Sequence, residues 1–192
     1  MNKHVIYMAA GNSRRFGSNK LLYHYQGKPL YRYGLDMAEN FCRERDDCSL
    51  LVVSRYQEIL KYAEKKKIRN VYSPDSDKGV SYTIRAALQA LGPVPEEDFI
   101  VFVVADQPNL KAKTLKKLLE LAEPGTETAS VMYGEQPGNP AMFSAKLIPE
   151  LLALQGDEGG RKVIRRHSCR YAYAEQEEEL YDIDTPEAVK AF

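Results

Sequence analysis

Short, strongly apolar runs alternate along this chain with longer segments of helical character, and this alternation limits the fold more than any other feature. The pattern is typical of strands joined by crossover helices, which build a largely parallel sheet. The expected strands are residues 4–10, 49–54, 70–73 and 98–105, and the expected helices are residues 29–45, 56–67, 81–91 and 112–122. The sequence therefore predicts an α/β protein.

The second part of the chain is expected to complete the same sheet. Residues 128–134 and 170–175 have the character of strands, and residues 147–155 form a short helix between them. The acidic run 177–179 is expected to be a solvated loop. Neither a repeat nor a linker rich in proline, glycine or serine divides the 192 residues, so residues 1–192 are expected to form one domain.

Charge balance and the length of the apolar runs limit the classes of function. Lysine plus arginine and aspartate plus glutamate number 27 each, so the chain lacks the overall positive charge that drives nucleic-acid binding. The apolar runs are too short for a signal peptide or a membrane span. We expect a soluble, cytoplasmic protein that binds neither nucleic acid nor membranes and keeps its three cysteines reduced.

The segment AAGNSRRFGSNK follows the first expected strand. A loop that leaves the carboxyl end of a parallel strand is where open α/β sheets bind ligands. Glycines let the backbone approach a ligand closely, and basic side chains supply charge that suits a triphosphate. The residues concerned are Gly11, Arg14, Arg15, Gly17 and Lys20. The spacing matches neither the dinucleotide-binding motif nor the P-loop, and a surface turn with solvated basic side chains is the alternative.

Two aspartates are candidates for a metal site. Asp106 directly follows the apolar run 98–105, at the sheet edge where the glycine loop is expected. A carboxylate there suits Mg²⁺, which takes one or two carboxylates from a protein and further oxygens from phosphates. Asp182 and Asp184 alternate along the segment YDIDTPEAV, and Asp184 is the candidate second ligand. Each aspartate could instead cap a helix or a turn.

Six stretches of the chain, in this order, resemble the MobA-like nucleotidyltransferases, and most closely the molybdenum cofactor cytidylyltransferases. They are AAGNSRRFGSNK, DKGVSYTIRAAL, ADQP, GNPAMF, GDEGGR and DIDTPEAV. The resemblance implies a Rossmann-like three-layer α/β/α sandwich of the nucleotide-diphospho-sugar transferase type, with a mixed, mostly parallel sheet. It also implies Mg²⁺-dependent transfer of CMP from CTP to the phosphate of molybdenum-loaded molybdopterin, with release of pyrophosphate.

The resemblance assigns catalytic and metal-binding roles to five residues. Lys20 would contact the phosphates and stabilise the transition state, with Arg14 or Arg15 adding positive charge. Asp106 and Asp184 would hold the Mg²⁺. An acceptor phosphate is already a good nucleophile, so the protein needs no general base and has only to position two anions and neutralise the charge between them.

The residues that the resemblance implies for ligand binding fall into three groups. The loop around the base and phosphates contains Ala9, Ala10, Gly11, Ser13 and Gly17. Gly79 and Ser81 match a stretch that helps to bind the base and sugar. The acceptor side is matched by Gly138, Asn139, Pro140, Gly156, Asp157, Gly160 and Arg161. Bulky Tyr82 stands beside the base where relatives have a small residue, and Gly160 stands where alanine is frequent, which is expected to be a mild change.

The base and the acceptor stay open from the sequence. Guanylyl-transferring relatives tend to carry glycine at the position of Ala10 and methionine at that of Phe16, so the residues here favour CTP. The alternatives are guanylyl transfer, transfer to a sugar phosphate or another small phosphorylated acceptor, and a nucleotide-binding regulator without turnover. The apo-molybdoenzyme is kept as a candidate partner, although nothing in the sequence identifies an interface.

Overall fold

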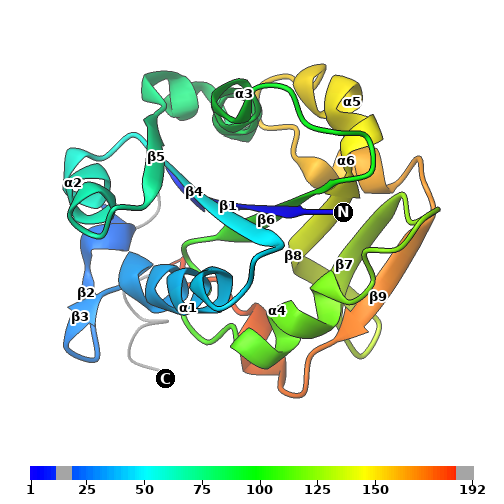
Figure 1. The fold of residues 1–192 in the computed structure, drawn as a ribbon. Coiled ribbons are helices and arrows are strands. Elements are labelled where there is room, and N and C mark those ends of the chain that lie inside the picture. The colour runs from blue at the N-terminus through cyan, green and yellow to red at the C-terminus, as the bar shows by residue number, and fades with distance from the viewer. Residues whose placement is uncertain (12–18, 185–192) are drawn as a thin grey trace.

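The computed structural model describes residues 1–11 and 19–184, and its main sheet has the strand order β5-β4-β1-β6-β8-β7-β9 (Figure 1). The strands are β1 (Lys3–Ala9), β4 (Cys48–Ser54), β5 (Arg69–Tyr72), β6 (Phe99–Val104), β7 (Thr128–Tyr133), β8 (Gln136–Ser144) and β9 (Cys169–Tyr173). The first four strands pair in parallel, β8 is antiparallel to both of its neighbours, and β9 is parallel to β7. The prediction of a mixed, mostly parallel sheet is confirmed.

Helices cover both faces of this sheet, as Figure 1 shows. One face packs against α1 (Tyr31–Arg43), α2 (Gln57–Lys65) and α4 (Ala112–Leu119), and the other against α3 (Val80–Leu91), α5 (Ile148–Leu152) and α6 (Gly160–Ile164). A small hairpin joins β2 (His24–Tyr25) to β3 (Lys28–Pro29), and 3-10 turns are formed by η1 (Lys20–Leu22), η2 (Pro74–Lys78), η3 (Ala145–Leu147) and η4 (Glu177–Leu180). The expected three-layer sandwich is therefore confirmed.

The core consists of two apolar clusters, one on each face of the sheet. Side chains of β6 alternate between them: Phe99, Val101 and Val103 pack into one cluster, and Ile100 and Phe102 into the other. None of these five residues is more than 4% exposed. Burial on both faces is the reason that this strand is apolar throughout its length.

Strand β8 is the strand that the sequence pattern does not predict. Its first half contains two prolines, a glycine and an asparagine, which are depleted in strands. The register of its pairing with β7 shifts between Ser130 and Val131, so that Asn139 and Pro140 fall outside the regular ladder. Such bulges redirect side chains, and this one lies beside the candidate site described below.

Two local expectations are corrected by the structure. Helix α1 begins at Tyr31 because Pro29 belongs to the β2–β3 hairpin. The acidic run is not wholly solvated, since Glu179 is fully buried. Its carboxylate accepts hydrogen bonds from the Thr114 hydroxyl and, at 3.3 Å, from the Lys111 amide. It therefore supplies an acceptor at the start of α4, where helix N–H groups lack partners.

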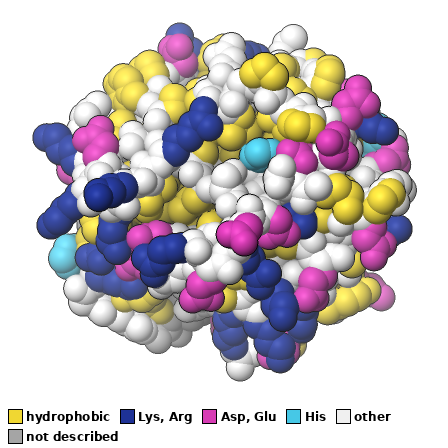
Figure 2. All heavy atoms as spheres, viewed as in Figure 1, with side chains coloured by type: hydrophobic (Ala, Val, Ile, Leu, Met, Phe, Trp, Pro, Cys, Tyr) yellow, Lys and Arg dark blue, Asp and Glu magenta, His cyan; other side chains and the backbone are white. Residues whose placement is uncertain are grey.

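The surface shows no separation of charge on the face drawn in Figure 2, where basic and acidic side chains are interspersed. This distribution agrees with the net charge of zero. Across residues 1–11 and 19–184, no helix has the length and apolar character needed to cross a membrane.

Candidate active site

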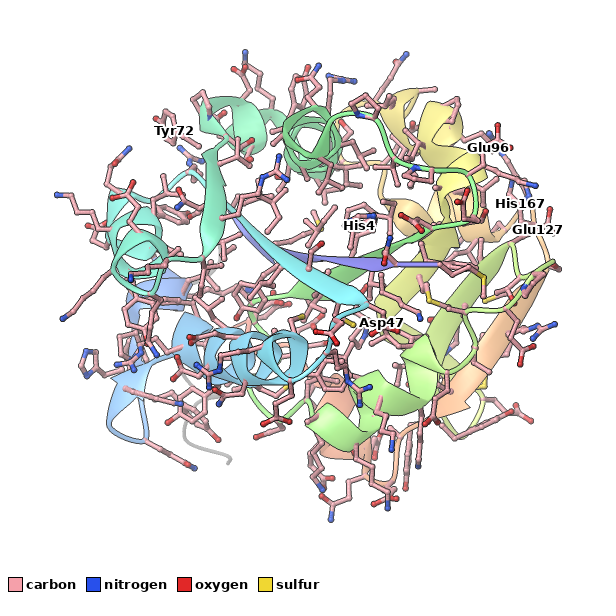
Figure 3. All side chains as sticks on the ribbon, in the orientation of Figure 1. His4, Asp47, Tyr72, Glu96, Glu127 and His167 are labelled. Carbon is pink, nitrogen blue, oxygen red and sulfur yellow. The ribbon has the colours of Figure 1, made fainter. Side chains whose placement is uncertain are left out.

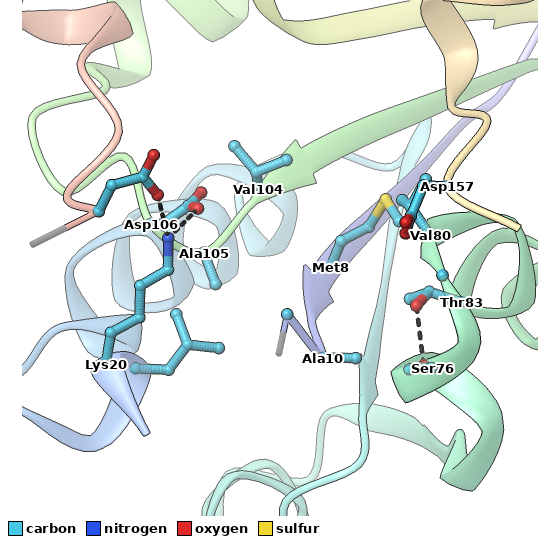
Figure 4. Close-up of a pocket in the computed structure, with 14 residues that line it drawn as sticks. Met8, Ala10, Lys20, Ser76, Val80, Thr83, Val104, Ala105, Asp106 and Asp157 are labelled. Atoms are coloured by element: carbon cyan, nitrogen blue, oxygen red, sulfur yellow. Dashed lines mark hydrogen bonds and ion pairs between the residues drawn. The ribbon is translucent and has the colours of Figure 1, made fainter. Parts of the chain in front are cut away.

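Lys20 and Asp106 meet at the carboxyl edge of the parallel strands (Figure 4), and Asp184 also pairs with Lys20 there. The Lys20 ammonium lies 2.7 Å from Asp106 Oδ2 and 2.8 Å from Asp184 Oδ1. Burial of Lys20 acts to lower its pKa, but the two carboxylates more than reverse this effect, so its pKa is raised. Lys20 therefore keeps its charge at neutral pH. Three of the residues expected to do chemistry are thus brought together from distant parts of the chain.

The short turn η1 holds Lys20 in place. The side-chain oxygen of Asn19 accepts a hydrogen bond from the Leu21 amide at 3.1 Å, which caps the first residues of the turn. Leu21 is buried in the core below. The ammonium is therefore fixed from a packed turn rather than carried on a solvated loop.

Asp184 is held beside Asp106 by contacts of the segment before it. The Ile183 amide donates to the Asp106 carbonyl at 3.0 Å, and the Gln107 side-chain amide donates to Asp182 Oδ1 at 2.9 Å. Although Asp182 keeps part of its surface in solvent, withdrawal of its carboxyl from water and the nearby Asp106 raise its pKa to about 6. The sequence analysis missed Gln107, although its place directly after Asp106 was a usable signal.

A cavity of about 420 Å³ opens beside Lys20 and the two aspartates (Figure 4). Three of the residues assigned to nucleotide binding line it, namely Ala10, Gly11 and Gly79. Ala9 and Ser81 are instead buried, each at most 1% exposed. The remaining residues of the loop, Ser13, Arg14, Arg15, Phe16 and Gly17, lie outside the described part of the chain.

Strand β4 fixes the backbone where β1 ends. Ser54 donates its hydroxyl to the Ala9 carbonyl at 2.7 Å. Tyr56, two residues further on, donates its hydroxyl to the Gly11 carbonyl at 2.6 Å. Sequence reasoning did not identify either residue, because their role depends on a pairing between strands that lie far apart in the chain.

The start of α3 forms the opposite wall of this cavity. Gly79 has a φ of 135° there, and a Cβ at this position would lie 2.2 Å from the Gly156 carbonyl, so a side chain is excluded. The Ser81 amide donates to the same carbonyl at 3.1 Å. Tyr82, expected beside the base, instead packs against Arg85, whose guanidinium carbon lies 5.2 Å from the ring centre.

A second cavity of about 910 Å³ adjoins the first and shares Met8, Val80, Val104 and Asp157 with it. Asn139, which the β8 bulge displaces from the ladder, lines this second cavity together with Arg161. The resemblance also assigned five other residues to the acceptor side. Three of them, Gly138, Asp157 and Gly160, line the second cavity, whereas Pro140 and Gly156 do not.

Gly160 is required by packing, so the expectation of a mild change at this position is wrong. A Cβ on Gly160 would lie 2.6 Å from the ring of Phe143. Phe143 is fully buried and packs edge-on against Phe102, with ring centres 5.7 Å apart. The ring therefore has little room to move away from an added methyl group.

The carboxylate pair has the chemistry of a magnesium site. Oxygens of Asp106 and Asp184 already converge on one positive charge, the Lys20 ammonium. The described ranges contain no group of three or more His, Cys, Asp or Glu side chains arranged for a metal. A pair of carboxylates nevertheless suits Mg²⁺, which completes its coordination with phosphate oxygens and water.

The fold and the site together define an α/β protein that presents a lysine and two carboxylates beside two adjoining cavities at its sheet edge. The MobA-like NTP transferase domain matches residues 5–171, and the chain belongs to this family. The prediction from the six motifs is confirmed at this level. The chain is therefore a nucleotidyltransferase by family.

Two curated proteins and one solved structure illustrate the relationship. The chain is 28% identical to the purine catabolism protein PucB of Bacillus subtilis, over 95% of this chain and 91% of that protein. It is 22% identical to the molybdenum cofactor cytidylyltransferase of Escherichia coli, with the same coverage. The Rv0371C complex with manganese from Mycobacterium tuberculosis superimposes with a TM-score of 0.76 at 23% identity, covering 100% of this chain and 97% of that one.

Proposed function

We propose that this protein is a cytoplasmic molybdenum cofactor cytidylyltransferase, which transfers CMP from CTP to the phosphate of molybdenum-loaded molybdopterin. The observation that carries the proposal is the position of Lys20 between Asp106 and Asp184, beside two adjoining cavities. The Escherichia coli cytidylyltransferase supports the choice of substrates, since its similarity extends over 95% of the chain. Ala10, which lines the first cavity, supports CTP rather than GTP.

In the reaction, an oxygen of the acceptor phosphate attacks the α-phosphorus of CTP and forms a new phosphorus–oxygen bond. The bond from the α-phosphorus to the oxygen that bridges it to the β-phosphorus breaks, and pyrophosphate leaves with the electron pair. Negative charge gathers between two anions, and a cation positioned in advance lowers this barrier. Lys20 supplies one such charge. Mg²⁺ held by Asp106 and Asp184 would supply a second by binding phosphate oxygens.

The two cavities suit the two substrates. The first cavity contains Lys20 and the start of α3, and it would receive CTP. The second is larger and presents Asn139 and Arg161, and it would receive the acceptor with its phosphate toward the shared wall. The manganese in the Rv0371C structure supports a divalent metal in this type of fold.

The test is pyrophosphate release by the purified protein with Mg²⁺, molybdenum-loaded molybdopterin, and CTP, GTP, ATP or UTP in turn. Release with CTP alone is the expected result. Release with GTP would identify a guanylyltransferase, and release only with a different phosphorylated acceptor would reject molybdopterin. Nucleotide binding without turnover under every condition would favour the regulator.

A further inference from the structure

Asp157 places a carboxylate on the wall shared by the two cavities, and the mechanism above does not use it. Asp157 lies between α5 and α6, is exposed, and lines both cavities. Figure 4 shows it beside Val80 and Met8, across the first cavity from Lys20. Asp157 therefore lies at the end of the first cavity opposite Lys20.

The backbone around Asp157 is held firmly against α3. The Gly156 carbonyl accepts the Ser81 amide at 3.1 Å. A Cβ on Gly79 would lie 2.7 Å from the Asp157 nitrogen, so the two segments are in direct contact only because residue 79 is glycine. The Asp157 carboxylate is therefore carried by a fixed backbone, as a recognition group must be.

Helix capping does not account for this carboxylate. Gly159 is the N-cap of α6, and no side chain caps that helix. The neighbouring Glu158 accepts the Gln155 amide at 3.0 Å and pairs with Lys162. Within residues 1–11 and 19–184, Asp157 itself has neither a hydrogen-bond partner nor an ion-pair partner.

The first cavity has different charged groups at its two ends. At one end, the Lys20 ammonium lies between the carboxylates of Asp106 and Asp184, which would hold Mg²⁺ for the phosphates under the proposed function. At the other end, Asp157 has no cation partner among the described residues and would repel a triphosphate. An ionised carboxylate only accepts hydrogen bonds, so it suits a neutral ligand group that carries N–H or O–H. The phosphates then belong at the Lys20 end and the nucleoside at the Asp157 end.

We infer that Asp157 is a nucleotide-recognition residue whose carboxylate accepts hydrogen bonds from a neutral donor of the nucleoside. Two groups have this chemistry, the ribose hydroxyls and the exocyclic amino group of cytosine. The inference rests on the proposed function. It assigns Asp157 to the nucleotide, whereas the resemblance had assigned this residue to the acceptor side. Facing the amino group, Asp157 selects CTP over UTP, whose carbonyl oxygen would meet a carboxylate. Facing the ribose, it selects ribonucleotides over deoxyribonucleotides.

The test measures nucleotide binding by isothermal titration with Mg²⁺, for the full chain and its Asp157→Ala and Asp157→Asn variants. The ligands are CTP, UTP, 2′-deoxy-CTP and 3′-deoxy-CTP. Asp46→Asn is the matched control, because Asp46 is an exposed aspartate outside both cavities. We expect Asp157→Ala to weaken CTP binding about tenfold, the loss typical of a hydrogen bond to a charged group.

The four ligands identify the donor. If the donor is the amino group, the native protein prefers CTP to UTP and Asp157→Ala loses that preference. If the donor is a ribose hydroxyl, removing that hydroxyl weakens binding to the native protein but not to Asp157→Ala. The inference is overturned if the variants bind all four ligands like the native protein, if CTP binds more tightly to Asp157→Ala, or if only the acceptor KM changes. Failure of the native protein to bind any nucleoside triphosphate would overturn the proposed function itself, before any variant is compared.

Discussion

Gln107 donates its side-chain amide to the Asp182 carboxylate at 2.9 Å and thereby fastens the segment that carries Asp184 to the turn that carries Asp106. The same amide also donates to the Leu180 carbonyl at 3.1 Å, and Gln107 is only 3% exposed. The two candidate metal ligands, Asp106 and Asp184, lie far apart in the sequence, so contacts such as this one bring them together. Gln107 is therefore a positioning residue for the carboxylate pair.

The first prediction concerns Gln107→Leu, which keeps the volume of the side chain but removes the donor. Both acceptors of this amide are only partly buried, so the loss is that of ordinary hydrogen bonds, and urea unfolding is expected to show a loss of about 0.5–1.5 kcal/mol. The Mg²⁺ concentration for half-maximal activity is expected to rise several-fold, because Asp184 is held less firmly beside Asp106. Gln89→Leu, at an exposed position on α3, serves as the control. A loss of stability with unchanged metal dependence would limit Gln107 to a structural role.

The second prediction concerns Lys20→Met. Pyrophosphate release is expected to fall about 100-fold or more, because the charge that stabilises the transition state is lost. The two carboxylates also lose their shared cation, so Mn²⁺ is expected to raise the melting temperature of the variant more than that of the native protein. Lys61→Met, at an exposed position on α2, is the control. Near-native release by Lys20→Met would remove Lys20 from the mechanism.

The parts of the fold that could be predicted from the sequence are those set by local pattern. The apolar runs of β1 and β6 indicated central strands because both faces of these strands are buried. Parallel strands present their carboxyl ends at one edge, which is why Asp106 was expected near the glycine loop and Lys20. The contact of Lys20 with Asp106 follows from this topology.

The parts that could not be predicted depend on contacts between distant segments. Strand β8 was missed because its proline- and glycine-rich first half reads as a turn, and its pairing to β6 and β7 outweighs that local preference. Glu179 looked like one residue of a solvated acidic run, and its contacts with Lys111 and Thr114, which lie far away in the sequence, account for its burial. The requirement for Gly160 likewise depends on the ring of Phe143, which the resemblance did not consider.

The third prediction follows from the close contact between Gly160 and the ring of Phe143. Gly160→Ala is expected to destabilise the protein by about 1–3 kcal/mol, because the added methyl group overpacks the site next to Phe143. In a Phe143→Leu background, which leaves room for the methyl group, the added cost of Gly160→Ala is expected to be smaller. Urea unfolding of the two single variants and the double variant gives the coupling energy. Additive effects would show that the two positions are independent.

The fourth prediction concerns His167, whose ring lies beside Glu127 in Figure 3. Its nitrogens lie 3.1 Å from Glu127 Oε1 and 2.8 Å from Glu150 Oε1. Hydrogen bonding to Glu127 raises the pKa of His167 against the opposing effect of burial, and Glu150 adds to the rise. Hydrogen bonds from Ser168 and then from His167 lower the pKa of Glu127 to about 2. The folded protein therefore holds the His167 proton more tightly than the unfolded chain does.

The sign of the pH effect follows from this difference. The stabilisation is fully present below the unfolded pKa of about 6.5 and is lost as pH rises through the raised pKa of the folded protein. Urea midpoints of the native protein, relative to those of His167→Gln, are expected to fall as pH rises above about 6.5. His24→Gln, at an exposed position on β2, is the control and is expected to track the native protein. Parallel profiles for the native protein and His167→Gln would refute the linkage.

The fifth prediction uses Arg161 to test which substrate occupies which cavity. Arg161 lines the second cavity but not the first, and it donates to the Pro137 carbonyl at 3.4 Å without pairing to a carboxylate in the described part of the chain. Its charge is therefore available to an anionic acceptor, so Arg161→Ala is expected to raise the acceptor KM about tenfold. CTP affinity is expected to stay at the native value, because the nucleotide would occupy the other cavity. Arg166→Ala, on the same segment but outside both cavities, is the matched control. If Arg161→Ala weakened CTP binding and left the acceptor KM unchanged, the assignment of the two cavities would have to be reversed.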